Sequence, residues 1–284
     1  MVQFMELLPA TMVAALLVSG MGVAILGSIK VALAARLQMD EARVGGLVSL
    51  FGFAMIPVML VVGFFTDQVD KQFIFLAGLL FIVLSLAALG WARSYLTALI
   101  GVVVFSMGWS LLINVGNVLV IPAFSRHEHD EAFASNLANV FFGLGAFLTP
   151  LAVTWLLRQT SFPATLGILA GLAVVPAVLA LRVDFSQFTP RAEAAVIGID
   201  ALLADPILWL CGFALFFYGP MEASLGAWTT TYLRDQGVKE SSAAGLLSAF
   251  WLTYMAARLI TAFALPPGNE RILILCLALA SVGV

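Results

Sequence analysis

Apolar stretches long enough to cross a bilayer return along the whole chain. About 20 apolar residues in a helix span the hydrocarbon core of a membrane. Short polar turns such as RLQMDEAR (36–43) and RHEHDEA (126–132) separate these stretches. β-Barrel strands would instead alternate over about ten residues. The pattern therefore predicts an all-α integral membrane protein, with spans at about 8–35, 44–65, 73–91, 96–124, 133–157, 162–182, 204–232, 241–265 and 271–284.

Composition supports this class of protein. The chain is 62% hydrophobic and only 10% charged, whereas a soluble domain carries roughly 25% charged residues. A water-soluble fold could not cover so much apolar surface, so the lipid bilayer is the expected surroundings. The net charge of −3 and the lack of a basic patch also exclude a nucleic-acid partner.

The last apolar stretch, RILILCLALASVGV (271–284), is shorter than the others. It is too short to cross a bilayer without further residues. We therefore expect eight full spans and part of a ninth, and we interpret the chain as a piece of a longer protein.

An internal repeat relates the beginning of the chain to a region 199 residues later. The offset aligns Gly20 with Gly219, and it also aligns GLVSLF (46–51) with GLLSAF (245–250). One register thus serves two spans and the turn between them. A repeat unit of six spans predicts a parent protein of two similar six-helix halves. The expected domains are a six-helix half at 1–183, a central linker at 184–203 and a partial second half at 204–284.

The turn GFFTDQVDK (63–71) joins the second and third spans. Gly63 permits close approach of a neighbouring helix. Asp67 at a helix end can accept backbone N–H groups or bind a cation of the opposing half. Such a contact would act as a latch that forms and breaks. The alternative is a solvated turn. With Asp70 and Lys71, the segment resembles the signature loop of the major facilitator superfamily, G-x-x-x-D-x-x-G-[RK], although Asp70 replaces the usual glycine.

This resemblance implies a fold of two six-helix halves that act as a monomer in the cell (inner or plasma) membrane. It also implies that the 63–71 loop is cytoplasmic, which makes the N-terminus cytoplasmic as well. At the repeat-related position, Arg258 is the expected gating residue of the second half.

The seventh and eighth spans resemble one branch of this superfamily. Tyr218, Glu222 and Trp228, together with FWLTYMAARL (250–259), are similar to the fucose-permease type of sugar symporter. That type has its proton-coupling carboxylates in the first and fourth helices. Neither of these spans contains Asp or Glu here. The resemblance therefore does not imply that carboxylates in these two helices couple transport to protons.

Four asparagines lie in the fourth and fifth spans as two pairs. Each pair has i, i+3 spacing and so shares one helix face. Buried amides suit a substrate rich in hydroxyl groups, because lipid leaves their hydrogen-bonding groups unsatisfied. Hydrogen bonding between helices is the alternative. The pairs are Asn114 with Asn117 and Asn136 with Asn139.

Glu222 is the one carboxylate deep within a span. An ionisable residue at this depth indicates a functional site by default. Tyr218, Glu222 and Thr229 share a helix face, and Trp228 follows on the same span. We expect these residues to bind the solute or couple its transport to H⁺.

The chain contains no Ser/His/Asp set, zinc-binding motif or phosphate-binding glycine loop. The sequence therefore predicts no enzyme, cofactor or metal site. It predicts a secondary active transporter that moves a small organic solute, with sugars as one candidate, by alternating access and with H⁺ as a candidate coupling ion. The alternative is a non-transporting membrane sensor or scaffold that retains the transporter fold.

Overall fold

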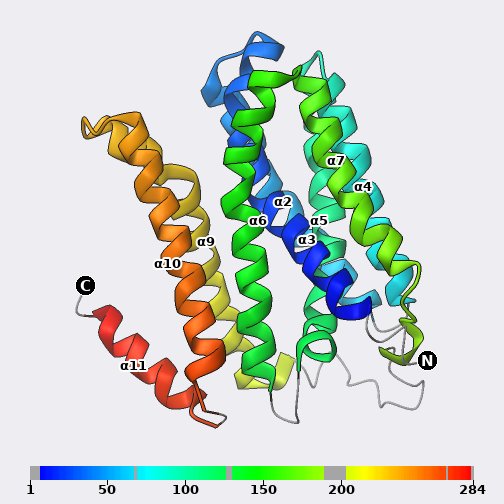
Figure 1. The fold of residues 1–284 in the computed structure, drawn as a ribbon, viewed down its shortest axis with the longest axis vertical. Coiled ribbons are helices and arrows are strands. Elements are labelled where there is room, and N and C mark those ends of the chain that lie inside the picture. The colour runs from blue at the N-terminus through cyan, green and yellow to red at the C-terminus, as the bar shows by residue number, and fades with distance from the viewer. Residues whose placement is uncertain (1–6, 67–68, 126–129, 189–202, 267, 283–284) are drawn as a thin grey trace. The chain divides into compact units, whose positions relative to one another are not determined.

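The computed structural model describes residues 7–66, 69–125, 130–188, 203–266 and 268–282. Within these ranges the chain forms helices and no β-strand (Figure 1). The helices are α2 (Leu7–Leu37), α3 (Glu41–Phe65), α4 (Lys71–Trp91), α5 (Tyr95–Phe124), α6 (Glu131–Gln159), α7 (Phe162–Ala180), the 3-10 turn η1 (Ser186–Phe188), α9 (Pro206–Asp235), α10 (Glu240–Ala264) and α11 (Glu270–Val282).

Each predicted span coincides with one α-helix. Among the described residues, seven helices are long and apolar enough to cross a membrane. A further apolar stretch, Pro206–Gly219, lies in α9. The predicted all-α, multi-pass fold class is confirmed.

Polar residues in the turns fix where the helices begin. Asp40 and Asp70 precede α3 and α4, and each carboxylate accepts the backbone N–H of the third helical residue, at 2.7 and 3.1 Å. Ser94 begins α5 in a reciprocal capping box with Thr97. These bonds satisfy N–H groups that have no partner within the helix.

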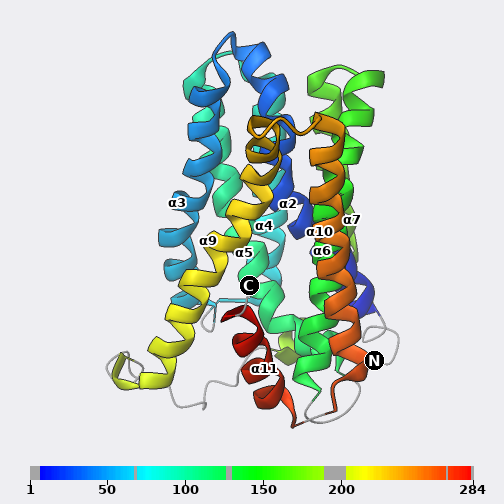
Figure 2. The same cartoon turned by 90° about the vertical axis from the view of Figure 1, so that its left-hand side faces the viewer.

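The chain divides into two compact units, of which one comprises Met1–Thr189 with Thr253–Val284 and the other comprises Pro190–Leu252. Within the first unit, α2 packs against α5, α6 and α7. Helix α4 packs against α5 and α7, and α3 packs against α5 (Figures 1 and 2). The second unit holds α9 and the first half of α10. The boundaries 1–183, 184–203 and 204–284 stay a prediction.

Glycines allow the α2–α6 contact to be unusually close. A Cβ on Gly20 would collide with the carbonyl oxygen of Phe142, and a Cβ on Gly145 would collide with the carbonyl oxygen of Leu17. The backbones of the two helices are therefore in direct contact. Small residues have this role in membrane helix pairs, where close van der Waals packing drives association.

Large apolar side chains cover the outside of the helices. Phe53, Trp91 and Trp155 are 72%, 68% and 62% exposed. An exposed apolar surface of this extent would be unfavourable in water. It suits a protein that is surrounded by lipid.

The residues directly after α7 still pack against helices of the first unit. Phe185 is buried, and its ring lies 5.6 Å from that of Phe75. Asp184 accepts the hydroxyl of Ser186 at 2.6 Å and its backbone N–H at 3.0 Å. The hydroxyl bond, followed by the backbone bond, holds the pKa of Asp184 below its ordinary value. The predicted linker thus begins with residues fixed to the bundle, and 189–202 lie outside the described residues.

Candidate functional site

Glu222 lies near the middle of α9, on the face predicted from its spacing to Tyr218 and Thr229. Its side chain is half-buried. Within the described part of the chain, its carboxylate makes no hydrogen bond or ion pair. A carboxylate without a partner inside a membrane-spanning segment is costly, which favours a functional role for Glu222.

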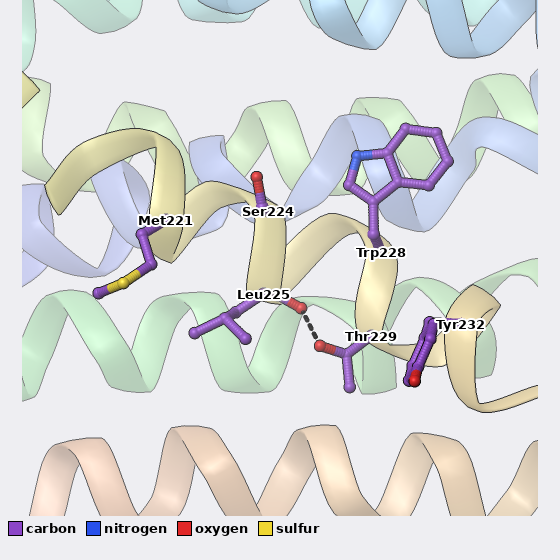
Figure 3. A pocket seen from close by; sticks show the side chains of 6 residues that line it. All are labelled: Met221, Ser224, Leu225, Trp228, Thr229 and Tyr232. Carbon is purple, nitrogen blue, oxygen red and sulfur yellow. Dashed lines mark hydrogen bonds between the residues drawn. The ribbon is translucent and has the colours of Figure 1, made fainter. Parts of the chain in front are cut away.

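A groove of about 380 Å³ runs along α9 (Figure 3). Trp228 and Tyr232 give it two aromatic rings one helical turn apart, and Ser224 and Thr229 add oxygen atoms. The Thr229 hydroxyl donates to the Leu225 carbonyl at 2.6 Å, so its oxygen remains available as an acceptor. Trp228 belongs to the groove as well as to the predicted site, whereas Glu222 and Tyr218 are not among its lining residues. The lining residues are Met221, Ser224, Leu225, Trp228, Thr229 and Tyr232.

The signature loop is described except for residues 67–68, so the predicted latch stays a prediction. Lys71 is only 1% exposed, and its Nζ donates to the Thr66 carbonyl oxygen at 3.4 Å. Asp70 is exposed and caps α4. Gly63 is exposed, and no atom of the residues that the structure describes lies within 4 Å of the position of a Cβ there. Asp67 lies outside the described residues. The lysine is therefore enclosed within its own unit.

The asparagines of α5 differ from each other. The hydroxyl of Thr66 lies 2.8 Å from Oδ1 of Asn114 and is assigned as the donor. Asn114 is half-buried, whereas Asn117, one turn further along α5, is exposed. Asn114 thus joins α5 to the end of α3, which is the interhelical role that the sequence left open.

The asparagines of α6 bond mainly within their own helix. Nδ2 of Asn136 donates to the Ala132 carbonyl and Nδ2 of Asn139 donates to the Ser135 carbonyl, both at 2.8 Å. The oxygen of Asn136 accepts a long bond of 3.4 Å from Nη1 of Arg258.

Arg258 also lies over an aromatic ring. Its guanidinium carbon is 5.1 Å from the ring centroid of Tyr254. The structure thus brings a predicted gating residue, Arg258, to a predicted substrate residue, Asn136. Both residues belong to the same compact unit.

Thr66 is a residue of this region that sequence reasoning missed. It is 4% exposed and contacts both Asn114 and Lys71. A hydroxyl residue directly before the loop aspartate was the available signal. Its partners could not be predicted, because Asn114 lies 48 positions away in the chain.

No group of three or more His, Cys, Asp or Glu side chains within the described ranges could hold a metal ion. What these ranges do contain is a bundle of apolar helices with a half-buried carboxylate, a buried lysine and amides inside the spans. These features define a polytopic α-helical membrane protein.

Residues 12–284 match the sequence profile of the Major Facilitator Superfamily, and the chain belongs to this family. The predicted superfamily is confirmed, while the fucose-permease branch stays a prediction. No curated protein matches the chain.

Two solved structures have a similar fold. One is the peptide transporter POT in complex with sulfate, with a TM-score of 0.55 and 16% identity over 82% of this chain and 47% of that chain. The other is a point mutant of peptide transporter POT in complex with sulfate, with a TM-score of 0.56 and 16% identity over 76% of this chain and 44% of that chain. The chain therefore spans less than half the length of either transporter, and the likeness concerns the fold alone.

Proposed function

We propose that the protein is a secondary active transporter of the cell membrane, which moves a small organic solute by alternating access between two six-helix halves. The observation that carries this proposal is the family match over residues 12–284. Inverted or parallel repeats around a midplane site are a common architecture for secondary transporters. The offset of 199 residues between the two similar regions supports the same organisation.

The proposed orientation has a cytoplasmic N-terminus. It depends on the resemblance of the 63–71 segment to a cytoplasmic loop, since the distribution of Lys and Arg does not distinguish the two sides. The protein is proposed to act as a monomer, without a cofactor and without enzymatic activity.

The proposed solute is a small molecule rich in hydroxyl groups, and sugars are the first class to test. The α9 groove supports this choice, because Trp228 and Tyr232 offer ring faces and Thr229 offers an acceptor oxygen. Aromatic rings pack on the C–H faces of a solute while hydroxyl oxygens fix its orientation. The two fold relatives are named as peptide transporters, so short peptides form the second class.

Coupling to H⁺ is proposed to involve Glu222. A carboxylate that gains and loses a proton can lower the cost of moving through an apolar environment, because its neutral form needs no counter-charge. Glu222 is half-buried near the middle of α9, as this role requires.

Uptake by the full-length protein in proteoliposomes tests the proposal. A panel of labelled sugars and di- and tripeptides is supplied with and without an inward proton gradient. Trp228→Ala is expected to lower uptake of the transported solute by roughly two- to tenfold, the range for loss of one ring contact. Trp155→Ala is the matched control, because Trp155 is an exposed tryptophan of α6 outside the groove.

Two results would contradict the proposal. Lack of flux across the whole panel would favour the non-transporting sensor or scaffold. Equal loss of uptake in Trp228→Ala and Trp155→Ala would remove the α9 groove from the solute pathway.

A further inference from the structure

Three helices meet at one residue, Thr66, at the end of α3. Its backbone N–H donates to the Val62 carbonyl at 2.8 Å and closes the last turn of α3. Its hydroxyl contacts Asn114 on α5, and its carbonyl oxygen accepts Nζ of Lys71 on α4. Thr66 is 4% exposed and its bond to Lys71 is buried, whereas its bond to the half-buried Asn114 is part-buried.

The hydroxyl of Thr66 has two acceptors within reach. The Val62 carbonyl oxygen lies at 2.6 Å and Oδ1 of Asn114 lies at 2.8 Å. A hydroxyl carries one proton and can donate to only one of them at a time. The Asn114 amide can bond in either case, because it presents Oδ1 as an acceptor or, turned through 180°, Nδ2 as a donor. Asn114 thus suits a permanent bond to Thr66.

Lys71 contributes the second link. Its amino group lies at the C-terminal end of α3, where carbonyl groups lack helical partners and where a cation is favoured. It is 1% exposed, and removing a partner from a buried polar group is costly. Lys71 therefore fastens the first turn of α4 to Thr66, the C-cap residue of α3.

Two described residues next to this link are exposed. Gly63 and Asp70 are exposed, and no atom of the described residues lies within 4 Å of the position of a Cβ on Gly63. The α3–α4 turn is thus fastened to α5 through Thr66 and Asn114.

We propose that Asn114 is a positioning residue, which acts through Thr66 and Lys71 to hold the α3–α4 turn at a fixed level against α5. Movement of α5 would then be passed to the turn. This coupling deepens the transport function proposed above and rests on it, whereas the positioning role itself does not depend on any solute. It also replaces the substrate-binding role that the i, i+3 spacing suggested for Asn114.

Hydrogen–deuterium exchange of the full-length protein in lipid nanodiscs tests the proposal without a solute. Asn114→Ala and Thr66→Val remove the two ends of the link. In each variant, amide exchange in the last turn of α3 and the first turn of α4 is expected to quicken by roughly two- to tenfold. The reason is that each variant loses one hydrogen bond that opposes local opening of these turns.

Three further variants separate positioning from a general loss of stability. Asn117→Ala is the matched control, since it removes an exposed asparagine one turn further along α5. Thr66→Ser keeps the hydroxyl and is expected to exchange as the wild type does. The double variant of Asn114→Ala with Thr66→Val is expected to resemble either single variant, because both remove the same link.

Two outcomes would overturn the proposal. One is exchange in Asn114→Ala that matches Asn117→Ala at the turn. The other is exchange that quickens equally over α2 and α4 to α7, which would indicate general loosening of the bundle. If Asn114→Ala does not fold, the comparison of Thr66→Val with Thr66→Ser decides the question. A failure of solute uptake with the expected exchange pattern would reject the transport function and keep the positioning role.

Discussion

Gly78 of α4 and Gly108 of α5 lie back to back, with no room for a side chain on either. A Cβ on Gly78 would be 2.9 Å from the carbonyl oxygen of Gly108, and a Cβ on Gly108 would be 2.7 Å from the carbonyl oxygen of Gly78. These backbone atoms cannot move aside to make room for a Cβ, as the end of a flexible side chain could. Gly78→Ala and Gly108→Ala are therefore each expected to lower the free energy of unfolding by about 1–3 kcal/mol, measured by denaturation in detergent micelles.

Gly171 provides the control for this prediction. It lies in α7, and among the described residues no atom is within 4 Å of the position of a Cβ on Gly171. Gly171→Ala is expected to stay within about 0.5 kcal/mol of the wild type. Equal stability of Gly78→Ala and Gly171→Ala would mean that α4 and α5 are not held in this close contact.

Lys71 is expected to stabilise the first unit, because it is buried there and bonds to Thr66. Lys71→Met keeps the buried stem and loses the bond to Thr66, at a cost of about 1–2 kcal/mol. Lys71→Glu would set a carboxylate against the Thr66 carbonyl and is expected to cost about 3 kcal/mol or more. The readout is the free energy of unfolding of the purified protein.

Arg93→Met is the control for the Lys71 variants, because Arg93 is an exposed cation in the turn between α4 and α5. It should leave stability within about 0.5 kcal/mol of the wild type. A Lys71→Glu variant as stable as Arg93→Met would show that Lys71 leaves its buried position in the membrane.

The spans could be predicted from the sequence because their signal is local. A helix in lipid must be apolar over its whole length and must satisfy its own backbone, so length and composition define it. The polar turns also carry their own capping residues, such as Asp40 and Ser94. The signature loop was recognisable for the same reason, since its residues are consecutive.

The contacts of the site could not be predicted, because they join residues far apart in the chain. The repeat aligns Gly20 with Gly219. Gly20 is in close contact with α6, whereas no described atom lies within 4 Å of the position of a Cβ on Gly219. A glycine in the sequence does not reveal its packing partner. Likewise the gating role of Lys71 stays a prediction, and its 1% exposure could not be predicted from the loop motif.

Arg258 and Asn136 are expected to be energetically coupled. Arg258→Ala and Asn136→Ala remove the two partners of the bond at 3.4 Å. In a double-mutant cycle on the free energy of unfolding, the coupling energy is expected to be about 0.5–1.5 kcal/mol. Asn139→Ala is the control, because the described bond of Asn139 is to its own helix. Additive effects of Arg258→Ala and Asn136→Ala would contradict a direct interaction.

Glu222 is expected to set the pH dependence of uptake. If transport requires its protonated form, the rate changes by at most roughly tenfold per pH unit, which is the limit for one proton. Glu222→Gln keeps the shape of the side chain and cannot titrate, so uptake by this variant in proteoliposomes should lose its dependence on pH. Glu131→Gln is the control, since Glu131 is an exposed carboxylate at the start of α6 and its loss should leave the pH profile unchanged. An unaltered profile in Glu222→Gln would assign proton coupling to another group and leave Glu222 as a candidate ligand for the solute.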